Sequence, residues 1–289
     1  MGNGKGQPRK RDMDAEALAK VAEIQFSGVL SQEEPNGTVA MPVRDHMNME
    51  TVRSILLTDW PHPIDQIFAG GNLLALQRNN LVNRMRGEWI LFIDDDMVWR
   101  PDAVKSLLAG REELRSMGHE PDVFGALCFK RAIPHQPTLL VKHESGPYNF
   151  LENWETDIVE VDATGMAFAI ISKSAFERIA DTPMPSYDER VQFRKSPDFF
   201  KWQGTVGEDI RFCQDVKSSG GRVFVDTRVS TGHMSELQIG YKQFLREVLD
   251  RQPVVSRARK KINDEMGLLT MTRKEAQRRY DILRKNEDY

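Results

Sequence analysis

The chain has 289 residues, of which 40% are hydrophobic and 29% charged, a composition typical of a globular protein with a substantial core. Its formal net charge of −3 argues against wholesale electrostatic capture of nucleic acid, and no apolar run approaches the roughly 20 residues of a membrane helix. The two cysteines, Cys128 and Cys213, have no zinc-type spacing and form no disulfide framework, which favours a reducing cytoplasm.

The order of the predicted elements indicates an α/β protein. Residues 1–36 are expected to form a flexible basic tail and an amphipathic helix. Strands and helices then alternate, which predicts a mostly parallel central sheet flanked by helices. The expected elements are a strand at 38–43, a helix at 48–60, a strand at 64–71, a helix at 72–87, a strand at 88–93, a helix at 100–118, a strand at 122–129, further strands at 138–143 and within 158–172, and a helix at 173–180.

A long connection follows at residues 181–207 and carries five aromatic side chains. Loops of that length in a compact domain are usually functional or disordered, and the aromatic content favours a function. Beyond it we expect a helix at 208–221 and a strand at 222–227. Residues 37–235 are therefore taken as the main domain, and residues 236–289 as a helical, charged C-terminal extension.

Three consecutive acids, Asp94, Asp95 and Asp96, follow the apolar strand candidate at residues 89–93. They stand at its C-terminal end, which is the edge of an open α/β sheet where ligands bind. Adjacent carboxylates repel one another, so we expect a cation or ligand donors to neutralise part of their charge. The alternative, that Asp96 or Asp102 caps the next helix, explains only one of the acids.

Two weaker signals lie further along the chain. Glu208 and Asp209 fall at a helix start behind Gly204 and Gly207, where the helix dipole favours negative charge, and such acids are common for stability alone. His233 follows a strand, and a lone histidine is more often a packed or exposed residue than a ligand. Imidazole with carboxylate nevertheless suits Mn²⁺, and Mg²⁺ also accepts carboxylates.

Taken in this order, the motifs resemble those of the GT-A nucleotide-sugar glycosyltransferases, nearest to the broad, mostly inverting family 2-like group. The resemblance runs from about Thr38 to Met234 and implies a Rossmann-like GT-A fold with helical N- and C-terminal extensions. The matching residues are Pro42 beside the nucleotide base, Arg78 and Asn79 near the donor diphosphate, the DxD motif at Asp94–Asp96, Gly165 on the acceptor side, the ED pair Glu208–Asp209, and His233 after the last core strand.

The resemblance implies a metal-dependent transfer of a sugar, of the hexosyltransferase type, from a nucleoside-diphosphate sugar to an acceptor hydroxyl. Mn²⁺ or Mg²⁺ would be held by Asp96 and His233, with Asp94 supporting the metal or contacting the ribose. Asp95 is included among the donor-binding residues. Such a metal would neutralise the charge that develops on the leaving diphosphate.

On the acceptor side, the resemblance implies Asp209 as the general base that takes the proton of the attacking hydroxyl. Glu208 is the reserve candidate for the base, or else an orienting residue. Direct displacement would invert the anomeric configuration. The loop around Phe199, Phe200 and Trp202 is expected to stack on the acceptor or to close over the donor, with a plain hydrophobic anchor as the alternative.

Two other functions stay open on the sequence. Asp94, Asp96 and Val98 satisfy the DxDx[TV] pattern of haloacid-dehalogenase-like phosphatases, in which Asp94 would attack phosphate and Asp96 would be the acid/base. That motif usually follows the first strand of its domain, whereas two βα units precede it here. The other alternative is a non-catalytic protein that binds sugar nucleotides, which turnover would exclude.

The C-terminal extension raises the question of the partner. Residues 242–289 contain 13 Lys/Arg against 8 Asp/Glu, with a basic cluster from Arg257 to Lys261. This segment is expected to be a solvated helix face or a homo-oligomer contact through the C-terminal helices. The alternatives are contact with nucleic acid, with an acidic protein or with a membrane surface. The acceptor is left open among a glycan, a protein and modified nucleic acid, for which the basic segment would be an electrostatic guide.

Overall fold

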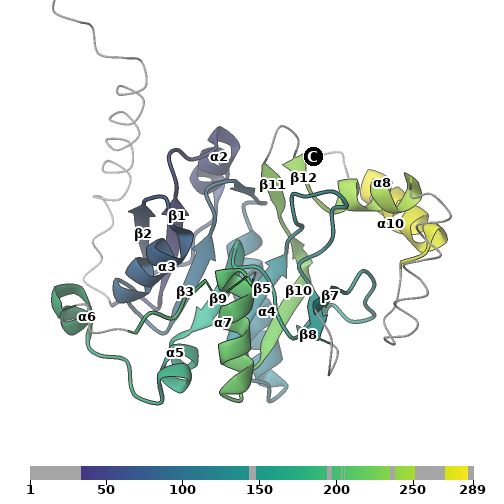
Figure 1. Cartoon of the computed structure of the whole chain (residues 1–289). Helices are drawn as coiled ribbons and strands as arrows, with labels where there is room; N and C mark the ends of the chain where they lie inside the picture. The colour runs from purple at the N-terminus through teal and green to yellow at the C-terminus, as the bar shows by residue number, and fades with distance from the viewer. Residues whose placement is uncertain are drawn as a thin grey trace, which may run out of the picture.

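Figure 1 shows the computed structural model of the chain. It describes residues 34–142, 148–193, 197–202, 204, 206–234, 238–250 and 271–285. The predicted N-terminal tail and amphipathic helix lie almost wholly outside these residues, as does the basic cluster from Arg257 to Lys261. None of the helices in the described ranges has the length and apolar character needed to cross a membrane.

A seven-stranded sheet in the order β2-β1-β3-β9-β5-β10-β8 forms the centre of the described chain. Five of these strands run in one direction and β8 and β9 run against them, so the predicted mostly parallel sheet is confirmed. Its strands are β1 (Gly37–Val43), β2 (Ile64–Gly70), β3 (Trp89–Ile93), β5 (Val123–Leu127), β8 (Ile158–Val161), β9 (Phe168–Ser172) and β10 (Val223–Ser230).

The central strands are buried on both faces, as their unbroken apolar sequences predict. In β3, Ile90 and Phe92 belong to one core cluster, whereas Leu91 and Ile93 belong to a second cluster. Successive side chains of a strand point to opposite faces, so each cluster lies on its own side of the sheet. Gly87 opens the turn before β3 with a φ of +76°, and a Cβ there would lie 2.4 Å from the carbonyl carbon of Asn36.

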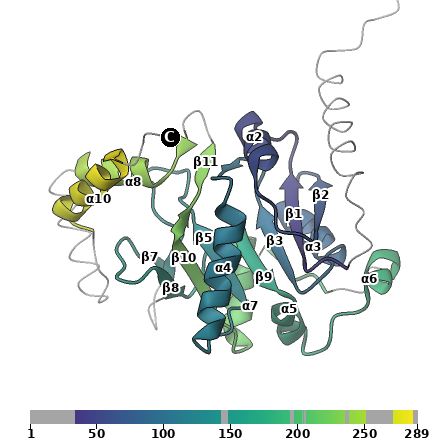
Figure 2. The ribbon, with the colours of Figure 1, turned by 180° about the vertical axis from the view of Figure 1, so that it is seen from behind.

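Helices cover both faces of the sheet, which confirms the predicted α/β layering. Figure 1 shows α3, α5 and α7 in front of the sheet, and Figure 2 shows α4 on the opposite face. The bounds of the helices around the sheet are α2 (Met49–Leu57), α3 (Leu74–Asn83), α4 (Ala103–Ser116), α5 (Lys173–Ala180), α6 (Tyr187–Phe193) and α7 (Glu208–Ser218).

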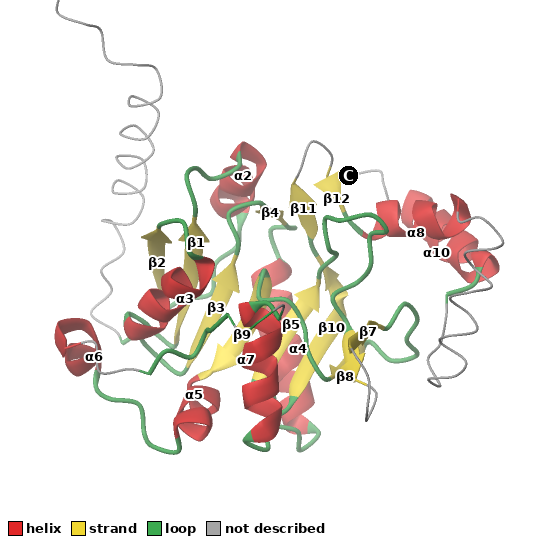
Figure 3. Cartoon of the chain, viewed as in Figure 1, coloured by secondary structure: helices red, strands yellow, loops and turns green. Residues whose placement is uncertain are grey.

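Two small sheets complete the described strands. One has the order β12-β11-β4 and lies beside the C-terminal ends of the central strands (Figure 3), and the other pairs β6 with β7. Helices α8 and α10 follow at the C-terminal end and pack against each other, and Phe244, Leu245 and Met271 join the core cluster that faces α7. The bounds are β4 (Met97–Val98), β6 (Leu140–Lys142), β7 (Tyr148–Phe150), β11 (Gly232–Met234), β12 (Gln238–Ile239), α8 (Tyr241–Asp250) and α10 (Arg273–Lys285).

Three local predictions need correction. The connection at 181–207 contains helix α6, which begins at Tyr187, where acids occupy the first turn. The strand β7 was not predicted, because its three residues are only half-buried and give no apolar run. Residues 238–239 form a strand, since they pair with β11, and the C-terminal helices begin only at Tyr241.

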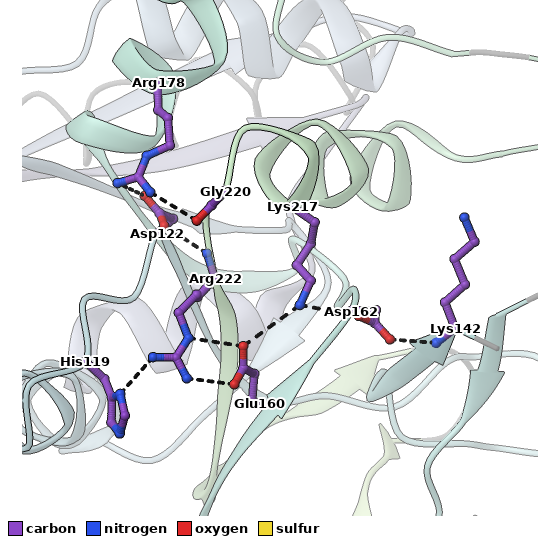
Figure 4. Close-up of polar contacts among 9 residues, drawn as sticks. All are labelled: His119, Asp122, Lys142, Glu160, Asp162, Arg178, Lys217, Gly220 and Arg222. Atoms are coloured by element: carbon purple, nitrogen blue, oxygen red, sulfur yellow. Dashed lines mark hydrogen bonds and ion pairs between the residues drawn. The ribbon is translucent and has the colours of Figure 1, made fainter. Parts of the chain in front are cut away.

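A charged network ties β8, β10 and α7 together at the edge of the sheet away from the three consecutive acids (Figure 4). Arg222 donates to Glu160 at 2.7 Å and lies 2.7 Å from His119 Nδ1, while Lys217 lies 3.4 Å from Asp162. The hydrogen bond from Arg222 lowers the pKa of Glu160. This network lies at the N-terminal end of β10, so we interpret it as a clamp on the antiparallel edge strand.

Candidate active site

A pocket of about 350 Å³ opens at the C-terminal ends of β1, β2 and β3. In open α/β sheets, ligands bind at this edge, outside the carboxyl ends of the parallel strands. We call it the strand-end pocket. The residues that define it here are Pro42, Arg44, Gln77, Asp94, Asp95, Asp96 and Arg131. Pro42 is buried within β1, where it is paired with Ala69, so the predicted nucleotide-side residue lines the pocket wall.

Asp94, Asp95 and Asp96 occupy a tight turn between β3 and β4, which we call the acid turn. The Asp94 amide donates to the Ala167 carbonyl at 3.0 Å, and the Asp94 carbonyl accepts from the Met97 amide at 3.2 Å. The turn therefore aims consecutive carboxylates in different directions, and each finds a different partner. Asp95 Oδ2 accepts from the backbone amide of Arg44 at 2.9 Å, which joins the end of β1 to the turn.

Arg78 joins the acid turn to helix α7. Its Nη2 donates to Asp94 Oδ1 at 2.8 Å, and its Nη1 forms a buried ion pair with Glu208. The guanidinium also lies over the Phe92 ring at 5.7 Å and the Phe200 ring at 5.9 Å from their centroids. Since the Arg78 side chain is only 2% exposed, this ion bridge fixes the acid turn against the start of α7.

Asp96 lies between an imidazole and a guanidinium. Its Oδ1 is 3.9 Å from His233 Nε2, and its Oδ2 accepts from Arg131 Nη1 at 2.5 Å. His233 Nδ1 lies 2.5 Å from the Phe129 carbonyl oxygen, which can only accept, so Nδ1 carries the proton. In the neutral ring, Nε2 would then carry the lone pair on the side of Asp96, which is the tautomer that a metal-ligating histidine needs. Burial raises the pKa of Asp96, against the opposing effects of His233 and Arg131.

Carboxylate and imidazole together form a donor set that suits Mn²⁺, and a carboxylate with phosphates suits Mg²⁺. Within the described ranges, no group of three or more His, Cys, Asp or Glu side chains converges as a metal centre. Two protein ligands fit a metal that takes the rest of its shell from phosphate oxygens and water. Asp96 and His233 therefore fit the predicted metal, whose binding stays a prediction.

Asp209 stands in the first turn of α7, beside the ion bridge. A Cβ built on Gly165 would lie 3.8 Å from Asp209 Oδ2 and 3.7 Å from Thr138, so the predicted acceptor-side glycine leaves room next to this carboxylate. Burial raises the pKa of Asp209, and Arg78 opposes the rise. A desolvated carboxylate has a more basic oxygen than one in water, which is a property that a general base needs.

The remaining predicted residues lie in the core or on the surface. Asn79 donates to the Phe200 carbonyl at 2.9 Å and accepts from the Phe200 amide at 2.8 Å. Phe200 is 1% exposed and stacks on Phe212 with centroids 4.6 Å apart. Asn79 therefore holds the loop around Phe200 in place. Phe200 itself is a hydrophobic anchor, which was the alternative to a role in stacking on the acceptor. Trp202 is 65% exposed and is the free aromatic face of this segment.

The sequence analysis missed two arginines that line the strand-end pocket, Arg44 and Arg131. Arg44 comes directly after β1, and Arg131 follows β5 by a few residues. Both therefore stand at the same strand ends as the acid turn. The sequence held a signal for both arginines, because each follows the C-terminal end of a predicted strand. The three acids were identified as candidates by the same kind of position.

Comparison with known proteins supports the resemblance to family 2-like glycosyltransferases. Residues 57–179 match the sequence model of the family described as glycosyl transferase family 2. These residues are similar to that family. The matched segment contains the acid turn, Arg78 and Gly165, and it ends before Asp209 and His233.

Two solved structures resemble the chain at a distance. The crystal structure of A197 from STIV is 16% identical, with a TM-score of 0.40, over 68% of this chain and 86% of that one. The crystal structure of S. aureus TarS 1-349 is 14% identical, with a TM-score of 0.38, over 73% of this chain and 63% of that one. No curated protein matches the chain in sequence.

Proposed function

We propose that the protein transfers a hexose from a nucleoside-diphosphate sugar to an acceptor hydroxyl, with inversion at the anomeric carbon, and that the reaction needs Mn²⁺ or Mg²⁺. The observation that carries the proposal is the Arg78 bridge between Asp94 and Glu208. It joins the acid turn of the strand-end pocket to the first turn of α7, where Asp209 stands. The proposed donor-binding edge and the proposed base would therefore lie near each other, as a displacement reaction requires.

In the donor half, Pro42 would border the base and Asp94 and Asp95 the ribose and diphosphate. Asp96 and His233 would hold the metal, which would neutralise the charge that develops on the leaving diphosphate. Arg78, which is buried and paired with Asp94, would keep the Asp94 carboxylate in place.

In the acceptor half, Asp209 would accept the proton as the acceptor oxygen forms its bond to the anomeric carbon and the bond to the diphosphate breaks. Glu208 is only 5% exposed and paired with Arg78, which supports an orienting role and leaves Asp209 as the base. Gly165 would leave room for the acceptor, and the exposed Trp202 would stack on it.

The phosphatase alternative needs Asp94 as a nucleophile with a free oxygen. Its ion pair with buried Arg78 works against that role, because the guanidinium holds one carboxylate oxygen and makes the carboxylate less nucleophilic. The cytoplasmic assignment is part of the proposal and rests on Cys128 and Cys213, which are free and buried. The acceptor remains open among a glycan, a protein and modified nucleic acid.

The test is a thermal-shift screen against UDP-, GDP-, CMP-, ADP- and dTDP-linked sugars, each with Mn²⁺, with Mg²⁺ and with EDTA. A ligand that binds only the folded protein raises the melting temperature, so one nucleotide class should stabilise the protein in a metal-dependent way. Release of nucleoside diphosphate from that donor, followed by an enzyme-coupled assay, then distinguishes a transferase from a binding protein.

Three variants assign the roles. Asp96→Asn and His233→Ala should abolish the metal-dependent part of the shift, whereas Asp209→Asn should keep the shift and lose turnover. Metal-dependent stabilisation that survived both Asp96→Asn and His233→Ala would remove the proposed metal site. No shift with any donor would send the assignment back to the phosphatase alternative.

A further inference from the structure

Arg131 has a contact that the proposed roles do not explain. It lies in the turn after β5, and its Nη1 donates to Asp96 Oδ2 at 2.5 Å, on the carboxylate whose other oxygen faces His233. A divalent cation shared between Asp96 and His233 would repel a guanidinium at that distance. The Arg131–Asp96 pair and a metal on Asp96 therefore compete for one carboxylate.

We propose that Arg131 is a movable countercharge, which occupies Asp96 until the metal and the donor bind and then transfers to the donor diphosphate. This inference rests on the proposed function. Arg131 is a positioning residue in this scheme. It neutralises Asp96 in the free protein, and it adds a bidentate contact to the phosphate oxygens in the complex.

Two arginines pair with acids of the turn, and their exposure differs. The exposed arginine can move away from its carboxylate, whereas the buried one is fixed. The Arg131 side chain is 55% exposed, whereas the Arg78 side chain is 2% exposed and bridges two carboxylates. Although the Asp96 side chain is only 18% exposed, the Arg131 end of the pair is in contact with water, so this guanidinium can leave at a lower cost than a buried one. Arg78 cannot leave Asp94 without stranding a buried charge.

The location of Arg131 gives it a second partner. It lines the strand-end pocket together with Arg44 and Gln77. A metal-bound diphosphate in this pocket would bring several phosphate oxygens to the acid side. A planar guanidinium released from Asp96 has the geometry to bind two of those oxygens at once.

The backbone around Arg131 is anchored, so the movement involves the side chain. The segment closes on itself through the bridge between Phe129 and Pro137. Its base is tied to α8, where the His135 amide donates to Glu247 at 2.5 Å and His135 Nε2 lies 3.1 Å from the same carboxylate. Arg131 therefore begins its swing from a fixed point at the rim of the pocket.

The experiment measures metal and nucleotide binding to the full chain by isothermal titration calorimetry, without any turnover. Mn²⁺ alone is titrated into the wild type and Arg131→Gln. We expect Arg131→Gln to bind Mn²⁺ about tenfold more tightly, because a competing positive charge a few ångströms from the metal is gone. The free nucleoside diphosphate that binds the wild type best, among UDP, GDP, ADP, CDP and dTDP, is then titrated at saturating Mn²⁺. We expect Arg131→Gln to bind it about tenfold more weakly.

Two further variants serve as controls. Arg44→Gln removes the same charge from the same pocket without removing the Asp96 contact, so its Mn²⁺ affinity should rise much less. Arg131→Lys keeps the charge and loses the bidentate fork, so Mn²⁺ affinity should stay near the wild-type value while nucleotide affinity falls. Melting temperatures confirm that each variant is folded.

The outcomes separate the inference from the function on which it rests. Equal Mn²⁺ affinity in the wild type and Arg131→Gln would overturn the proposal that Arg131 competes with the metal for Asp96. Tighter Mn²⁺ binding with unchanged nucleotide affinity would overturn the transfer to the diphosphate. If the wild type bound Mn²⁺ but none of the nucleoside diphosphates, the proposed function would fail first, and the transfer step with it.

Discussion

The buried ion bridge at Arg78 permits a stability prediction with a magnitude. Arg78→Met keeps most of the side-chain volume between the Phe92 and Phe200 rings and removes the charge. Glu208, whose side chain is 6% exposed, would then be a buried carboxylate without its partner, while Asp94 at 21% exposure keeps some contact with water. Breaking one side of a buried pair reduces stability by about 3–5 kcal/mol.

Because only one of the two carboxylates is fully stranded, we expect Arg78→Met to lose about 3 kcal/mol, the lower end of that range. The assay is urea unfolding at pH 8, followed by tryptophan fluorescence and analysed for midpoint and slope. Arg53→Met on the exposed face of α2 is the matched control, since the Arg53 side chain is 71% exposed, and it should change stability by less than about 0.5 kcal/mol.

A double variant tests the cause. In Arg78→Met with Glu208→Gln, the stranded charge is absent, so about half or more of the lost stability should return. A loss below about 1 kcal/mol in Arg78→Met would show that the bridge is solvated and not buried, against the burial argument. A double variant less stable than the sum of the single variants would show that packing, and not the unpaired charge, is the cause.

Four shorter predictions concern Asp209, Asn79 and Trp202. Burial raises the pKa of Asp209, so its charged form weakens folding at neutral pH and Asp209→Asn should melt at the same or a higher temperature. With wild-type protein, turnover should fall as the pH drops through that raised pKa in a pH–rate profile. Asn79→Ala leaves two Phe200 backbone groups unpaired and should lose about 2–3 kcal/mol in urea unfolding. Trp202→Ala should leave stability within about 0.5 kcal/mol but raise the acceptor KM.

The sequence predicts the sheet well where side chains alone determine burial. β3 is an unbroken apolar run, and such a run is buried whatever the direction of its neighbours. The same property hides strand direction, because β9 is just as apolar and lies antiparallel between β3 and β5. Direction depends on the route of the connecting chain, which local pattern does not record.

The position of the acid turn was predictable because it depends on one strand and its end. The pairings in the site were not, since they join residues far apart in the chain. Asn79 and Phe200 are 121 positions apart, and Arg78 and Glu208 are 130 apart. A motif can suggest that each residue matters, but whether Asn79 contacts a ligand or clamps a loop depends on what the fold brings beside it.

The three acids of the turn differ most in how their charges are compensated. Asp94 is paired with a buried arginine, and Asp95 accepts a hydrogen bond from the backbone amide of Arg44, just after β1. Neither partner can therefore move without unfolding part of the site. Asp96 alone is paired with an exposed arginine on one oxygen, while its other oxygen lies 3.9 Å from His233 Nε2. An incoming divalent cation can displace the first partner and use the second. The carboxylate that the family resemblance assigns to the metal is therefore also the one whose surroundings allow the exchange.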